Sequence, residues 1–434
     1  MSSKIEKLLR IVEPTFTVLA LIQYSADWMP LILSGGVSEG DGVDINSFNF
    51  TLNVLTYLLT YMISGFLLLL RWKKVVYFMS KDRIVWVLVG IAIASFLWSV
   101  SPARTLKSCI GLIGTTFFGL YLGTRYSIRD QVKLLGLAYG LIIVFSILFA
   151  VGLPRYGIMG GVHAGAWRGI FTHKNFFGRA LAFSGVLFAI LTNINTQKKW
   201  LPWLGIVAVM GLLVLAKSTT SMINFVVLVS SLYAYRVLRL RYFLMIPGFF
   251  AIIAVGGVVI DWYTQNATAI LGSVGKDPSL TGRTDLWAWV GEMIDKRPIL
   301  GYGFTAFWNG LDGPSAYVVR AARWPVPYSH NGLLDLWLDL GLLGVSAYIL
   351  GFGLNLLRAV WWARFSVGFD GLWPLVYLTY TVLSNLTEGG IIAQNGIFWV
   401  LYTTLSISLV VPPDNLHEAK AKGMLDNHSK AWTN

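Results

Sequence analysis

Charged residues and cysteine are both scarce in this chain, and each shortage excludes a class of protein. Only 13% of the 434 residues are charged, about half the ~25% of an average soluble protein. An ordinary soluble domain is therefore excluded. Cys109 is the only cysteine, which excludes an intrachain disulfide and a cysteine-based metal site.

Long runs of apolar residues make up much of the chain. Hydrophobic residues make up 56% of the chain, and runs of about twenty such residues can cross a hydrocarbon core of ~30 Å. We therefore predict an all-α polytopic membrane protein, a single integral membrane domain over 1–434 with about twelve transmembrane helices. The predicted spans lie near 14–35, 52–70, 84–99, 108–123, 134–153, 179–194, 201–216, 222–235, 243–262, 332–357, 372–386 and 392–411.

The positions of the cations predict the topology. The net charge is +13, and about two-thirds of the Lys and Arg residues fall at the N-terminus, in the C-terminal tail and in loops that an even span count places on one side. The positive-inside rule makes that side cytoplasmic, with both termini and the tail 413–434 inside. It leaves a large external loop, 263–331, between spans nine and ten. Because the cations flank spans, we expect no nucleic acid partner.

Two external segments carry cations against this bias. Segment 154–178 includes Arg168 and Lys174, and segment 263–331 includes Arg283. An anionic ligand at the outer leaflet is one explanation. The alternative is that long external loops are translocated whatever their charge.

Arg283 begins a predicted amphipathic helix, 283–296, for which Thr281 is the expected N-cap and Pro298 the stop. A helix N-terminus favours anions, and a guanidinium can bind phosphate oxygens through two hydrogen bonds. Arg283 is therefore a candidate diphosphate ligand. The alternatives are an ion pair with Asp285 and a contact with a lipid headgroup.

His330 follows Ser329, the expected N-cap of the tenth span. The positive end of the helix dipole favours a neutral imidazole, which could act as a general base. The alternative is an interfacial histidine bonded to a backbone carbonyl.

Further polar residues lie in the same predicted outer segments. Arg168, His173 and Lys174 precede the sixth span, and Lys217 opens the eighth. These four are candidates for substrate or diphosphate binding, although cations at such positions also snorkel to headgroups or simply flank a span. Glu388, at the outer mouth of the eleventh span, could bind an acceptor, orient His330 or be solvated.

Three motifs together resemble the O-antigen ligase/polymerase superfamily, the WaaL/Wzy-like proteins. They are Gly-Arg-x-x-x-Trp at 282–287, Arg-Pro-x-Leu-Gly-x-Gly at 297–303 and Ser-His-Asn at 329–331. The run Phe-Thr-His-Lys-Asn at 171–175 looks like the ExoQ-type exopolysaccharide polymerase branch. Where many relatives have Ser-Arg after the seventh span, this chain has Ser218-Thr219, so Lys217 is the candidate for the missing charge.

The resemblance implies a GT-C-like fold and glycosyl transfer from undecaprenyl diphosphate at the periplasmic face of the bacterial inner membrane. His330 would activate the acceptor and Arg283 would hold the leaving diphosphate. The Asp-x-Asp pair of metal-dependent transferases is missing, so we expect neither a metal nor another cofactor. Implied partners are the lipid-linked oligosaccharide, the growing polysaccharide, membrane lipid, and flippase, export or chain-length proteins.

Three alternatives stay open at this point. A ligase moving finished glycan onto the lipid A core uses the same chemistry, and the 171–175 motif favours a polymerase. A lipid-linked glycan flippase or transporter would show paired repeats and a site near the bilayer midplane, whereas the polar residues here gather in external segments. A scaffold subunit would need neither His330 nor Arg283.

Overall fold

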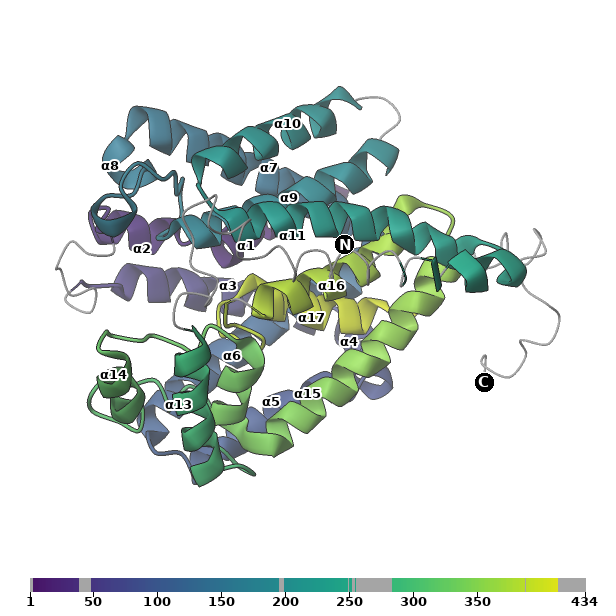
Figure 1. Ribbon diagram of the computed structural model, residues 1–434. Helices are drawn as coiled ribbons and strands as arrows, with labels where there is room; N and C mark the ends of the chain where they lie inside the picture. Colours follow the sequence, from purple (N-terminus) through teal and green to yellow (C-terminus); the bar gives the residue numbers. More distant parts are fainter. Residues whose placement is uncertain are drawn as a thin grey trace.

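The computed structural model describes residues 3–38, 48–194, 199–248, 250–251, 254, 283–386 and 388–412 (Figure 1). Across these residues the regular structure is helical, apart from one isolated β-bridge between Ile158 and Trp167. The predicted all-α class is therefore confirmed. The Thr281 N-cap, the loop residues 263–282 and the tail 413–434 lie outside the described residues.

The helices follow one another along the chain as follows: α1 (Ser3–Ser25), α2 (Trp28–Leu33), α3 (Thr51–Leu69), α4 (Trp72–Lys81), α5 (Ile84–Ala94), η2 (Ser95–Leu97), α6 (Pro102–Arg125), α7 (Ile128–Gly152), α8 (Pro154–Gly157), η3 (Gly161–His163), α9 (Lys174–Ile194), α10 (Trp200–Leu215), α11 (Thr219–Ala234), η4 (Tyr235–Arg239), α13 (Arg283–Lys296), α14 (Ala316–Ala322), α15 (Gly332–Phe365), η6 (Phe369–Leu372), α16 (Trp373–Asn385) and α17 (Ile397–Ser408).

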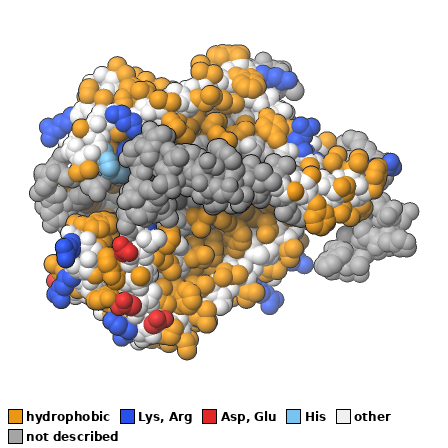
Figure 2. Space-filling view, in the orientation of Figure 1, with side chains coloured by type: hydrophobic (Ala, Val, Ile, Leu, Met, Phe, Trp, Pro, Cys, Tyr) orange, Lys and Arg blue, Asp and Glu red, His pale blue; other side chains and the backbone are white. Residues whose placement is uncertain are grey.

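Six of the described helices are long and apolar enough to cross a membrane, namely α3, α6, α7, α9, α11 with η4, and α15. Three shorter apolar helices, 84–97, α10 and α17, accompany them. Hydrophobic side chains cover much of the visible flank of the molecule (Figure 2), as expected for a surface that faces lipid. The chain is thus a multi-pass membrane protein. The ninth predicted span lies largely outside the described residues, and the count of twelve stays a prediction.

Close packing of α6 on α17 depends on small residues. A Cβ on Gly119 would lie 2.7 Å from the carbonyl oxygen of Val400, and one on Gly123 would lie 2.8 Å from that of Thr404. The Thr404 hydroxyl donates to the carbonyl of Gly119 at 3.0 Å. Glycines one turn apart therefore let two backbones touch, as is common in membrane bundles.

A kink in α15 receives the 297–303 turn. The kink lies at Gly341, whose φ is +64°. The backbone N–H of Tyr302 donates to the carbonyl of Leu338 at 2.7 Å, and that of Leu342 donates to Pro298 at 2.8 Å. These bonds hold α13 beside the first half of α15, as Figure 1 shows.

Several predicted outer segments contact one another at one end of the bundle, the left side of Figure 1. The backbone N–H of Val100 donates to the carbonyl of Tyr302 at 2.9 Å, and Arg168 donates to that of Val37 at 3.0 Å. The other ends of α3 and α6 are held by Glu13, which pairs with Arg71 at 2.7 Å and Arg125 at 3.1 Å.

Candidate active site

Glu388 is the centre of the candidate site. It is 6% exposed and lies in the loop between α16 and α17. Tyr328 donates its hydroxyl to Oε2 at 2.6 Å, and Nδ1 of His330 is 3.4 Å from the same oxygen. On Oε1, Nδ2 of Asn175 donates at 3.4 Å and Nη2 of Arg283 lies 3.9 Å away. The structure therefore brings His330 and Arg283 together on one carboxylate.

These contacts decide the ionisation of Glu388. Burial alone would raise its pKa, but the hydrogen bonds with His330 and Tyr328 and the positive charge of Arg179 outweigh it and lower the pKa from 4.5 to about 2. At neutral pH the group is therefore a carboxylate that only accepts hydrogen bonds.

His330 adopts a left-handed backbone conformation, with φ of +56°. Its neighbours hold it there: Ser329 donates its hydroxyl to the carbonyl of Asn331 at 2.7 Å and its N–H to Asp335 at 2.9 Å. The N-cap of α15 is Asn331, whose side chain accepts from the backbone N–H groups of 333 and 334. Ser329 was therefore wrongly predicted as the cap. The difference places His330 in the turn before the helix, where its ring can reach Glu388.

Arg283 is the first residue of α13, as predicted. One turn later, the indole Nε1 of Trp287 donates to the carbonyl of Ser329 at 3.0 Å. Asp335, which accepts the N–H of Ser329, also accepts a hydrogen bond from Nε1 of Trp308 at 2.9 Å. It therefore links Trp308 to the same turn. Residues 283–287 and the Ser-His-Asn motif thus form one bonded unit.

A cavity of about 380 Å³ opens beside this unit. Its lining includes Tyr328, Asp335, Arg179 and Asp27. The Arg179 guanidinium lies 4.9 Å from the ring centroid of Phe398. Arg179 was not predicted as a site residue. The sequence did contain a usable signal, since an arginine inside an apolar span is costly and usually functional.

Arg168 does not face this cavity. It is fully buried, and its guanidinium donates to the backbone carbonyls of residues 36, 37, 155, 156 and 172. Five carbonyls occupy its donors, so Arg168 holds two loops together, and its predicted role in binding diphosphate stays a prediction.

His173, Lys174 and Lys217 lie around the 158–174 loop. His173 packs edge-on against His163, with ring centroids 5.3 Å apart, and Lys174 begins α9. Lys217 is exposed, and its Nζ lies 3.6 Å from the point that a Cβ on Gly165 would occupy. Their predicted roles stay predictions.

Two other residues of the 171–175 motif bond acidic side chains at the site. Thr172 donates its hydroxyl to Oδ2 of Asp27 at 3.3 Å, and Asn175 bonds Glu388 as described above. The motif at 171–175 thus reaches the site through Phe171, which lines the cavity, and through Thr172 and Asn175.

Residues 204–349 match the family model Wzy_C, described as O-antigen ligase. The chain carries an O-antigen ligase family domain. The matched residues include both Arg283 and His330. The predicted family is confirmed.

Individual relatives agree with this family. The exopolysaccharide production protein ExoQ of Rhizobium meliloti is 26% identical over 293 residues, which cover 64% of this chain and 65% of ExoQ. A protein of Rickettsia felis provisionally named polysaccharide ligase is 22% identical over 265 residues, or 59% of this chain and 63% of the relative. The matches therefore span slightly less than two thirds of either relative.

Proposed function

We propose that this protein is a membrane glycosyltransferase that polymerises undecaprenyl-diphosphate-linked repeat units into an exopolysaccharide. The observation that carries the proposal is the joint contact of His330 and Arg283 with the Glu388 carboxylate, beside a cavity. The O-antigen ligase domain and the relative named for exopolysaccharide production support it. The proposed reaction uses the chain's own side chains and no metal.

The geometry supports a specific proton path. Because the Glu388 carboxylate can only accept, the neutral ring of His330 carries its proton on Nδ1, which leaves Nε2 able to accept one. Nε2 takes the proton of an acceptor hydroxyl, and the hydroxyl oxygen bonds to the anomeric carbon of the donor. The bond from that carbon to the diphosphate oxygen breaks, and the lipid diphosphate leaves with the electron pair. Arg283 and Arg179 stabilise the charge that develops on it.

The orientation in the membrane is part of the proposal. Arg71 and Arg125 lie at the end of α3 and α6 that is far from Glu388. Cation-rich loops favour the cytoplasm. The Glu388 end then faces the periplasm, with both chain termini cytoplasmic in a bacterial inner membrane.

A deletion strain complemented with His330→Ala tests the function. We expect single repeats to accumulate on the carrier lipid, no long polymer, and an unchanged lipid A core. Asn193→Ala, an exposed amide at the end of α9, is the matched control and should restore polymer. Wild-type polymer from His330→Ala would instead favour a transporter or scaffold.

A ligase is the second candidate, since the matched family model is described as O-antigen ligase. It predicts a different intermediate. Full-length polymer would then remain on the carrier lipid in the His330→Ala strain, and the lipid A core would lack it.

A further inference from the structure

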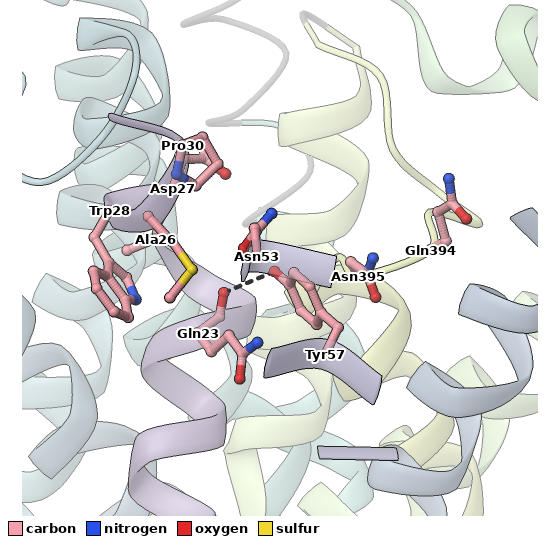
Figure 3. Close-up of a pocket in the computed structure, with 10 residues that line it drawn as sticks. Gln23, Ala26, Asp27, Trp28, Pro30, Asn53, Tyr57, Gln394 and Asn395 are labelled. Atoms are coloured by element: carbon pink, nitrogen blue, oxygen red, sulfur yellow. Dashed lines mark hydrogen bonds between the residues drawn. The ribbon is translucent and has the colours of Figure 1, made fainter. Parts of the chain in front are cut away.

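A second cavity adjoins the one at Glu388. It has a volume of about 230 Å³ and lies between the end of α1, the start of α3 and the 394–395 loop (Figure 3). Asp27 and Asn395 line both cavities. The two cavities are therefore neighbours, with Asp27 and Asn395 in the wall of each.

Amide side chains dominate its polar lining. The side chains of Asn53 and Gln394 form no hydrogen bond with any part of the chain that the structure describes, although both line the cavity. Asn395 accepts from the Tyr61 hydroxyl through Oδ1, which leaves its NH₂ group available. Gln23 differs, because two threonine hydroxyls of α3 already bond its amide. Three amides thus offer unused donors and acceptors.

The chemistry of the lining limits which kinds of ligand the second cavity can bind. It contains the carboxylate of Asp27 and neither Lys nor Arg, so it disfavours an anion such as phosphate. An apolar group would leave the amides unpaired, which is costly. Neutral hydroxyls both donate and accept, as amides do. Trp28 and Tyr57 add aromatic surface for the apolar face of a ring.

The volume of the second cavity fits one part of a ligand better than a whole small molecule. Pockets for whole small molecules are usually about 300–1,000 Å³, and this one has about 230 Å³. It suits one unit of a longer molecule whose next unit lies in the cavity at Glu388.

We propose that this cavity is a sugar subsite, which binds an uncharged sugar ring of the lipid-linked glycan next to the ring that reacts. The inference rests on the proposed function and adds a substrate contact to it. Asn53 and Gln394 recognise the ring hydroxyls, and Asp27 lies at the junction between the two rings.

Kinetics of full-length protein in membranes test the subsite. Asn53→Ala and Gln394→Ala each remove one or two neutral hydrogen bonds to the ligand, so we expect KM for lipid-linked repeat units to rise about 3- to 10-fold. kcat should change less, because the reacting groups remain. Asn193→Ala is the matched control and should keep the wild-type KM.

Thiol labelling tests binding without turnover. Cys109 is buried, so Asn53→Cys supplies a single accessible thiol. In a His330→Ala background, repeat units extracted from the deletion strain should slow maleimide labelling of Asn53→Cys and leave Asn193→Cys unaffected. Protection by Ca²⁺ alone would overturn the inference in favour of a cation site.

The two hypotheses fail in different ways. Wild-type KM in Asn53→Ala and Gln394→Ala, with no protection from labelling, would overturn the sugar subsite while leaving the transferase in place. Wild-type activity in His330→Ala would overturn the transferase itself.

Discussion

The indole Nε1 of Trp287 donates a hydrogen bond to the backbone carbonyl of Ser329 at 3.0 Å, and so joins the helix of Arg283 to the turn of His330. Trp287 follows Arg283 by four residues, which places both on one face of α13. The spacing in Gly-Arg-x-x-x-Trp therefore has a physical reason. The arginine reaches Glu388, and the tryptophan fixes the distance between the two motifs.

Trp287→Phe removes this donor and keeps the aromatic ring. The Ser329 carbonyl loses a neutral hydrogen bond worth about 1 kcal/mol, and the His330 turn loses a restraint. We expect kcat to fall about 3- to 10-fold while KM and the amount of protein in membranes stay close to wild type. Trp289→Phe is the control, since the indole of Trp289 forms no hydrogen bond within the described residues. Equal losses in the two variants would contradict the restraint.

Glu388 should make the stability of the folded protein depend on pH. Its pKa is lowered from 4.5 to about 2, so its contribution is present above pH ~4.5 and is lost as the pH falls toward ~2. The full shift corresponds to about 3 kcal/mol. Glu388→Gln cannot titrate. We expect the unfolding free energies of wild type and this variant to converge as the pH is lowered from about 5 to 2, measured by denaturant unfolding in detergent. A constant difference would exclude this role.

The sequence predicted the helical class, because the length of apolar runs is a local property. The meeting of His330 with Arg283 was expected only from the resemblance of their motifs to a known family. The contacts of Arg168 could not be predicted, since a guanidinium that binds five backbone carbonyls looks the same in sequence as one that binds phosphate. Arg179 was missed for the opposite reason. Two of its neighbours, Phe398 and Glu388, come from a distant segment, and only the fold brings them to it.

The kink of α15 can be tested with a pair of glycines. Gly341 has φ of +64°, and a Cβ there would lie 2.2 Å from the carbonyl oxygen of Ile299, whereas Gly353 in the same helix has open space. Gly341→Ala should cost about 1–3 kcal/mol from backbone strain alone and displace the 297–303 turn. Gly353→Ala should be neutral or slightly stabilising. Unfolding in detergent measures both, and similar effects would show that the kink is dispensable.

Lysine substitutions of Arg168 and Arg283 can distinguish a structural role from a functional one. Arg168 is fully buried among five carbonyls, while the side chain of Arg283 is 22% exposed beside Glu388. A lysine keeps the positive charge, but its ammonium group lacks the planar arrangement of several N–H donors that a guanidinium has. Arg168→Lys therefore leaves buried carbonyls unpaired and should destabilise the protein by about 2–4 kcal/mol, with less protein in membranes and near-normal turnover per folded molecule. Arg283→Lys should leave stability unchanged and reduce turnover about 10-fold or more, because the proposed paired hydrogen bonds to diphosphate are lost. Protein level, unfolding and turnover measured on the same preparations distinguish the two. A stable, inactive Arg168→Lys would return that residue to the diphosphate site.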